Sequence, residues 1–230
     1  MRSWAPSAAE REGGLDVLGV TIGGKHTWWD WGLVLRQYPE ITPPSPKTKI
    51  ISIPGADGVL DLSTALTGYV LYENRTITFE FTIMKPRDMW PATYSEILDH
   101  LHGRELEIIM DDDREHYYKG RVQVTTHNPE KVTAGITLKA NVEPYKTRCL
   151  VEQRSATITG SGTLTIVGKR KPVIPTIKAT ADMKMTFGGR TYDLTAGENR
   201  LPEVVMLEGE NMFTFTGTGT VTFEYREGRL

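Results

Sequence analysis

Nucleophilic catalysis is the first chemistry that these residues invite. Ser161 stands between Gly160 and Gly162, but the segment lacks the Gly-x-Ser-x-Gly spacing of a nucleophile elbow and lies among threonines, where no strand-to-helix turn is expected. The single cysteine, Cys149, has no histidine near it in the sequence. Because a lone cysteine is more often a small packed hydrophobe than a nucleophile, we expect no catalytic residue.

Histidines and aspartates suggest metal binding. His100 and His102 are two residues apart, and on a helix such a pair cannot share one ion, because residues on one helical face are three or four apart. The acidic run of residues 111–113 precedes His116, but the alternating aspartates and the glycine of a calcium loop are missing. We interpret the run as a solvated turn between two strands, and we expect no metal ion and no cofactor.

Acidic pairs and a glycine-rich loop add little further chemistry. Among 29 Asp and Glu residues, pairs that resemble those of glycoside hydrolases can always be found. A hydrolase is therefore a third interpretation, and it requires a deep cleft with two facing carboxylates. Residues 53–58 are rich in glycine but lack the Lys-Ser/Thr of a phosphate-binding loop. We interpret them as a tight double turn.

Three tryptophans form the most unusual local cluster: Trp28, Trp29 and Trp31. On a strand, Trp29 and Trp31 would share one face and form a sugar platform, a core anchor or a protein interface. Burial in a core or against another subunit is the commonest fate of such rings. We therefore name Trp28, Trp29 and Trp31 as candidates for an assembly interface.

Composition excludes several function classes. The 27 Lys and Arg residues nearly balance the 29 Asp and Glu residues, which gives a net charge of −2 and argues against a protein whose main task is to grip nucleic acid. No apolar run approaches the ~20 residues of a membrane span, and residues 1–24 show no secretory signal. With one cysteine, we expect a soluble protein made in a reducing cytoplasm.

Charge and composition change along the chain. Residues 1–144 carry 15 basic and 20 acidic side chains, a net charge of −5, whereas residues 145–230 carry 12 basic and 9 acidic ones, a net charge of +3. Fourteen threonines lie between Ser155 and Glu224, which is typical of short strands. We predict one domain over residues 1–146, of which 1–18 are an extension, and a second over residues 147–230.

The hydrophobic pattern favours strands in both domains. In residues 76–83, apolar and polar residues alternate strictly, which predicts a half-buried strand. Gly188-Gly189 predicts a two-residue hairpin turn with positive φ. A second hairpin-like unit is expected between the Gly-Glu-Asn triplets at 197–199 and 209–211, and the short, closely spaced strands indicate a β-sandwich. Similar alternation occurs at 122–124, 136–142, 183–187 and 221–225.

One segment has helical spacing instead. Residues 93–102 carry an apolar stripe at i, i+3, i+4 and i+7. Thr93 and Glu96 match a capping box at its start, and Gly103 supplies a stop with positive φ. The chain is therefore predicted to be mainly β (α+β), with one helix in the first domain. The stripe consists of Tyr94, Ile97, Leu98 and Leu101.

Taken in order, several motifs resemble the distal tail protein (Dit) family of long-tailed bacteriophages. The resemblance runs from about residue 20 to residue 230, and the departures from it are residues 1–18 and the tryptophan cluster. The segments that carry it are 32–35, 53–62, 72–81, 101–104, 117–121, 144–145, 207–211, 217–221 and 225–230, together with the acidic turn.

This resemblance implies a non-enzymatic assembly protein. An N-terminal β-rich domain with one α-helix would form a ring of six subunits, and a galectin-like β-sandwich would decorate its outside. The homo-hexamer would connect the tail tube protein to the tail-tip or baseplate proteins, and DNA would pass through its lumen without specific binding. Its place would be the virion tail tip of a phage or prophage, after assembly in the bacterial host cytoplasm, with no membrane contact. The length leaves no room for an inserted carbohydrate-binding module.

The uneven charge fits a DNA conduit, because an acidic lumen repels phosphate and opposes adhesion. The alternative function, from another class, is a carbohydrate-binding β-sandwich protein of a host-adhesion device, in which Trp28, Trp29 and Trp31 stack on the sugar. A ring of six copies would favour the hub, whereas a sugar-binding monomer would favour this alternative.

Overall fold

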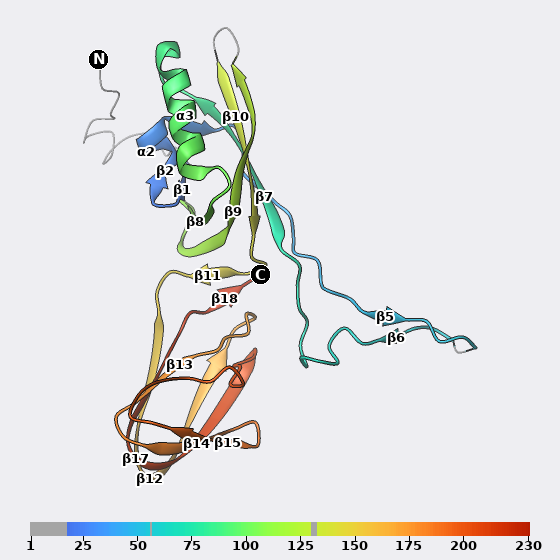
Figure 1. Ribbon diagram of the computed structural model, residues 1–230, viewed down its shortest axis with the longest axis vertical. Helices are drawn as coiled ribbons and strands as arrows, with labels where there is room; N and C mark the ends of the chain where they lie inside the picture. Colours follow the sequence, from blue (N-terminus) through green and yellow to red (C-terminus); the bar gives the residue numbers. More distant parts are fainter. Residues whose placement is uncertain (1–17, 56, 130–132) are drawn as a thin grey trace. The chain divides into compact units, whose positions relative to one another are not determined.

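The computed structural model describes residues 18–55, 57–129 and 133–230. The chain divides into two compact units, with the boundary between Pro144 and Tyr145. Strands account for 56% of the structure, in two curled antiparallel sheets with one main helix (Figure 1). The prediction of a mainly β chain is confirmed. None of the helices in the described part of the chain has the length and hydrophobicity needed to cross a bilayer.

The first unit is built on an antiparallel sheet with the strand order β2-β1-β8-β9-β10-β7-β3, and β4 also pairs with β7. Its centre is made of three neighbouring strands, β9, β10 and β7, so that segments far apart in the sequence lie side by side (Figure 1). The strands are β1 (Val20–Ile22), β2 (Lys25–His26), β3 (Leu33–Leu35), β4 (Glu40–Ile41), β7 (Arg75–Ile83), β8 (Glu105–Met110), β9 (Asp113–Pro129) and β10 (Ala134–Val142).

Strand β7 follows directly from its sequence. The apolar residues of its alternating pattern, Ile77, Phe79, Phe81 and Ile83, are all buried, as one dry face and one wet face require. The register pairs Phe79 with Leu138 of β10, so the apolar faces of the two strands form one surface. The strand predicted over residues 76–83 is confirmed.

Helix α3 (Trp90–Leu101) covers the apolar face of this sheet and contributes Trp90, Ile97 and Leu101 to its core (Figure 1). The predicted helix is confirmed, but the predicted capping box is wrong. A 3-10 turn, η1 (Arg87–Met89), leads straight into the helix, and Met89 is the N-cap without a side-chain cap. Thr93 is buried inside the helix. The stop at Gly103 is confirmed, with a φ of +76°.

Between β4 and β7 the chain forms a long excursion. Its two limbs are joined by β5 (Ile50–Ile51) and β6 (Leu60–Asp61), which pair antiparallel, and by a bridge between Pro46 and Tyr72. We call residues 42–74 the arm. Gly55 and Gly58 near its tip have φ angles of +84° and +77°, as a pair of tight turns requires.

The second unit is a sheet that curls around its own core. Strand β17 (Gly209–Tyr225) pairs with β12 (Glu152–Gly168) along its whole length. Its other edge pairs first with β14 (Met183–Phe187) and then with β13 (Thr176–Ala179). Two shorter pairings complete this sheet: β14 with β15 (Arg190–Leu194) and β13 with β16 (Gly197–Arg200). Outside this sheet, β11 (Lys146–Arg148) pairs with β18 (Gly228–Arg229).

Glycines place the turns and bends of this unit. Gly188 and Gly189 have φ angles of +57° and +77° and join β14 to β15, so the predicted hairpin turn is confirmed. Gly160 and Gly217 lie opposite each other in β12 and β17. A Cβ on Gly217 would stand 2.8 Å from the Cβ of Met183, so the close approach there requires glycine.

The two Gly-Glu-Asn triplets do not enclose a hairpin, which corrects the expectation. They begin β16 and β17, and both strands pair with β13 rather than with each other. Each asparagine folds back on the residue four positions before it. Asn199 accepts from the backbone N–H of Thr195 at 3.0 Å, and Asn211 accepts from that of Leu207 at 2.9 Å. The triplets are therefore strand-initiating turns.

Candidate assembly surfaces

The tryptophan cluster lies on a short helix, α2 (Thr27–Trp31), and not on a strand face as expected. The cause is local. The Nδ1 atom of His26 accepts the backbone N–H groups of Trp28 and Trp29, both at 3.2 Å, and the Asp30 carboxylate accepts the N–H of His26 at 2.7 Å. Both ends of this reciprocal cap stabilise the first helical turn.

The helix separates the three rings. Trp31 is fully buried, and its ring meets that of His100 edge-on at a centroid distance of 5.6 Å. Trp28 and Trp29 are half-buried and pack edge to face at 6.4 Å. The structure thus brings Trp28 and Trp29 together at the surface and assigns Trp31 to the core. The three rings do not form one flat platform for a sugar.

The imidazole of His26 is held by the carboxylate of Asp111, which the sequence analysis assigned to a solvated turn. Its Nε2 atom lies 3.0 Å from Oδ2 of Asp111, and the same oxygen accepts the N–H of Gly19 at 2.9 Å. Because Nδ1 accepts two N–H groups, the ring proton is on Nε2 and is donated to Asp111. A Cβ on Gly19 would stand 2.4 Å from the imidazole, so this contact needs glycine. Sequence reasoning missed the site because histidine is not among the usual N-cap residues.

The rest of the acidic turn is divided among separate partners. Asp112 accepts a hydrogen bond from the Tyr38 hydroxyl at 2.8 Å, and that bond, with partial burial and the nearby charge, raises the pKa of Tyr38 to about 12. Asp113 contacts Nδ1 of His116 at 2.7 Å. Within residues 18–55, 57–129 and 133–230, no group of three or more His, Cys, Asp and Glu side chains is placed to hold a metal ion.

The remaining residues considered for chemistry serve different contacts. His100 Nε2 lies 3.1 Å from the carbonyl oxygen of Gly23, whereas Nδ1 of His102 accepts the N–H of Val124 at 3.2 Å. Cys149 is half-buried in the second unit. The structure therefore brings none of these three side chains together.

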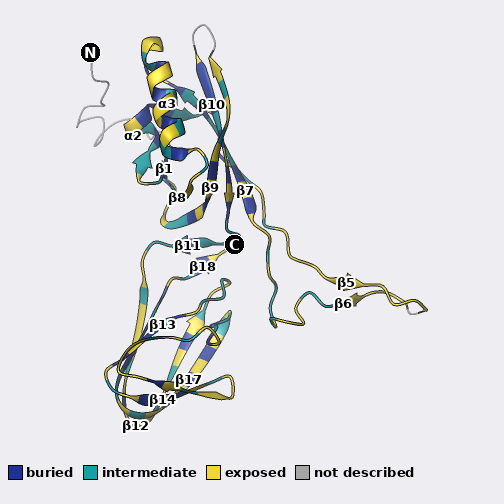
Figure 2. Cartoon of the chain, viewed as in Figure 1, coloured by how far each residue is buried: buried dark blue, intermediate teal, exposed yellow. Residues whose placement is uncertain are grey.

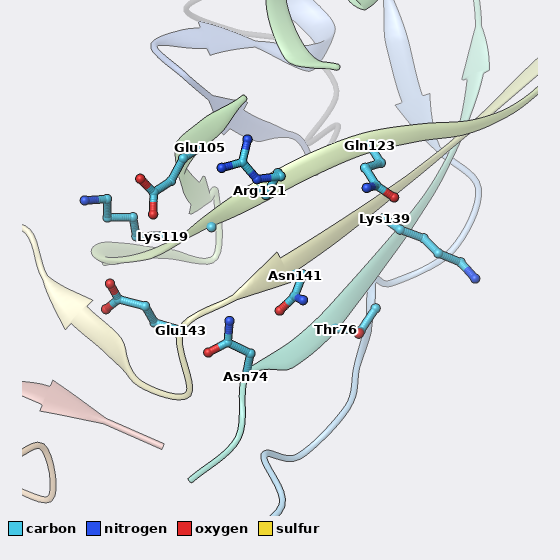
Figure 3. Close-up of a pocket in the computed structure, with 10 residues that line it drawn as sticks. Asn74, Thr76, Glu105, Lys119, Arg121, Gln123, Lys139, Asn141 and Glu143 are labelled. Atoms are coloured by element: carbon cyan, nitrogen blue, oxygen red, sulfur yellow. The ribbon is translucent and has the colours of Figure 1, made fainter. Parts of the chain in front are cut away.

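A polar hollow of about 410 Å³ lies on the sheet of the first unit (Figure 3). Its side chains come from β7, β8, β9 and β10 and carry both signs of charge, with Glu105 and Glu143 beside Lys119 and Arg121. Such interleaved charges suit a surface that stays in contact with water. The other lining residues are Asn74, Thr76, Gly120, Gln123, Lys139 and Asn141.

The arm is a surface that its own unit leaves uncovered. Among its described residues none is buried (Figure 2). Hydrogen bonds join its two limbs, as from Lys47 N to Leu71 O and from Leu62 N to Lys49 O, both 2.8 Å. Exposed apolar side chains gathered on one segment are typical of protein interfaces. Its large exposed apolar side chains are Ile50, Ile51, Ile53, Val59, Leu60, Leu66 and Leu71.

Comparison of the sequence with models of protein families and with curated proteins gives no match. The structure is similar to a solved one, the SPP1 Dit protein (gp 19.1), which is described as a paradigm of the hub adsorption apparatus in phages that infect Gram-positive hosts. The TM-score is 0.68 at 14% identity, over 94% of this chain and 100% of that one. The resemblance to distal tail proteins is thus confirmed at the level of the fold, and the chain has a Dit-like fold.

Proposed function

We propose that the protein is a phage or prophage distal tail protein, a non-enzymatic homo-hexameric hub. The first unit forms the ring, and the second unit is a galectin-like domain on its outside. The ring connects the tail tube protein to tail-tip or baseplate proteins at the virion tail tip. The Dit-like fold supports the family, and the arm is the observation that carries the assembly role.

The arm supports assembly because it has no core of its own. Leu66 is 99% exposed, Val59 61% and Ile50 54%, and leaving such side chains in water forgoes roughly 1.5–3 kcal/mol each. A neighbouring copy that covers them recovers this free energy. Contact between an arm and a different surface of the next copy is head-to-tail, and such contacts form a ring when the rotation between copies closes.

Trp28 and Trp29 are our second candidate for this interface. Both are half-buried, their backbone is fixed by the His26 cap, and their rings pack on each other at 6.4 Å. Partly exposed tryptophans on such a fixed segment are typical of interface anchors. Trp31 is not a candidate for this interface because its side chain is fully buried in the core. The sugar-binding alternative loses its platform for the same reason, and we do not pursue it.

DNA passage rests on charge. The segment assigned to the ring has a net charge of −5, and the polar hollow mixes acidic and basic side chains. We expect the hexamer to retain no double-stranded DNA at physiological salt, because phosphate binding needs clustered Lys and Arg. Retention of DNA on the assembled ring in a filter assay would argue against the conduit.

Native mass spectrometry tests the oligomeric state. The chain should be co-expressed with the neighbouring tail proteins, so that a partner needed for assembly is present. Complexes that contain six copies of this chain support the proposal. Complexes with one or two copies, beside otherwise normal tail assembly, would overturn it.

A further inference from the structure

Strand β12 is an unusually long sheet edge. It pairs with β17 over all of residues 152–168, and in the described part of the chain no other strand of the second unit pairs with it. Strand β17 separates it from β13 and β14. The outer side of β12 therefore presents a row of backbone N–H and C=O groups, which is a template for pairing with another chain.

The sequence of this edge lacks the usual protection. Folded proteins blunt exposed edges with charged residues, proline or very short strands. Between Ser155 and Gly168 the chain has no charged residue and no proline. The charges of β12 are confined to its start, where Glu152 pairs with Arg148 and Arg154. An edge of this length and composition is expected to be covered in the working assembly.

The order of residues indicates what covers it. The segment is nearly palindromic about Ser161, with glycine, threonine and apolar positions repeated in reverse order on either side. If two copies of β12 pair antiparallel with Ser161 opposite Ser161, similar residues face each other from position 156 to position 166. The resulting pairs are Gly160 with Gly162, Thr159 with Thr163, Ile158 with Leu164, Thr157 with Thr165, and Ala156 with Ile166.

Both faces of such a pair are satisfied. Ile158 and Ile166 are buried in the core of the unit, and Ala156 and Leu164 are half-buried against it. Pairing about Ser161 places each of the buried residues opposite a half-buried one, so the two cores become continuous across the contact. The threonines lie on the exposed face, where directly opposite Thr–Thr pairs stabilise a sheet.

The glycines at the centre fit the same register. Gly160 has a φ of +77°, and a Cβ on Gly162 would stand 2.7 Å from Cδ1 of Ile158. The backbone at Gly160 therefore favours glycine, and a side chain at Gly162 would have to displace the end of the Ile158 side chain. In the paired strands each Gly160 faces Gly162 of the other copy, so no side chain obstructs the closest approach at the centre.

We propose that β12 pairs with β12 of a second copy of this chain, antiparallel and about a two-fold axis at Ser161. The contact is isologous, because the same patch serves both partners, and it is distinct from the head-to-tail contact that closes a ring. It uses the second unit alone and does not depend on the arm.

A single engineered cysteine tests the axis. In a chain with Cys149→Ser, the Ser161→Cys variant places two thiols directly opposite each other, where antiparallel Cα atoms are about 4.5–5.5 Å apart. This separation suits a disulfide. Thr216→Cys is the matched control, since Thr216 is exposed and lies opposite Ser161 on β17. It is one strand further from the axis in each copy, so its Cα atoms would be roughly 15 Å apart, too far for a disulfide.

Under mild oxidation we expect covalent dimers of Ser161→Cys to form at least about tenfold faster than those of Thr216→Cys, because only the first pair meets the distance limit. Equal rates, or a Ser161→Cys chain that stays monomeric, would overturn the proposal. The second result would leave the edge to a strand from a different protein. The cross-link should persist when Val59→Asp and Leu66→Asp remove the arm contact. The experiment thereby distinguishes a failure of the proposed ring from a failure of the proposed β12–β12 contact.

A second variant addresses the edge itself. Thr159→Lys with Thr163→Lys places like charges opposite each other in the pair and should abolish the Ser161→Cys cross-link. Far-ultraviolet circular dichroism should show the folded spectrum, because both side chains are exposed. Unchanged cross-linking in this folded variant would contradict the register.

Discussion

The Nε2 atom of His26 donates to Oδ2 of Asp111 at 3.0 Å, across 85 positions of sequence. The other nitrogen of the ring caps α2, so one imidazole connects the β8–β9 turn to the helix that carries the tryptophans. The helix that carries Trp28 and Trp29 is therefore held by a hydrogen-bond chain in addition to the burial of Thr27 and Trp31.

Removal of this anchor should destabilise the first unit. In Asp111→Ala, the imidazole Nε2–H of His26 and the backbone N–H of Gly19 lose their shared acceptor. We expect the unfolding free energy to fall by about 1–3 kcal/mol. Urea denaturation measures it. Asp112→Ala is the control in the same turn, since it removes only the exposed bond to Tyr38. Equal losses for the two variants would contradict the anchoring role.

The tryptophans should separate into two classes. Trp31→Ala removes a fully buried ring and should cost about 3–5 kcal/mol in unfolding free energy. Trp28→Ala and Trp29→Ala should change stability much less and weaken assembly instead. Denaturation curves together with the mass of the complex separate these effects. Trp29→Ala chains that assemble like the wild type would remove Trp29 from the interface.

The arm should matter for assembly and not for folding. Val59→Asp with Leu66→Asp introduces charges at exposed positions that do not pair across β5 and β6, so the unfolding free energy of the monomer should stay within about 0.5 kcal/mol of the wild type. The ring should be lost, because the buried charges would have no partners. Leu150→Asp, at an apolar residue that is 68% exposed outside the arm, is the control. Light scattering gives the mass, and loss of assembly in the control alone would refute the assignment.

Acid should destabilise the first unit through His127. Burial lowers the pKa of His127 below its ordinary value, and its ring stacks on Tyr94 at 4.0 Å. As the pH falls below about 6.5, the unfolded chain therefore binds more protons at this histidine than the folded chain does. The stability contributed by the neutral imidazole is present above this pH and is lost as the pH falls to the lowered pKa of the folded state. His127→Phe should keep the stacking and flatten the dependence on pH between 7 and 5. An unchanged slope in urea denaturation would rule out His127 as its source.

Sequence patterns predicted the elements whose signal is local and periodic. The alternation of Phe79 and Phe81 and the Gly188-Gly189 turn each follow from one short segment. The start of α3 was misplaced because η1 and Pro91, rather than Thr93, set the entry into the helix.

The candidate interface was harder to predict, because it depends on distant contacts. The turn at α2 needs the carboxylate of Asp111, far along the chain. The isoleucines at 50, 51 and 53 have the composition of a buried strand, yet all three are exposed. The three-dimensional arrangement shows that their own unit does not bury them, and we propose that another molecule covers them.

The central claim is the ring of six copies, and images of single particles test it most directly. Particles purified with the neighbouring tail proteins should give class averages with sixfold symmetry and a central opening, and the arm variant Val59→Asp with Leu66→Asp should give none. Particles of the wild type without rotational symmetry, or with a closed centre, would contradict the account.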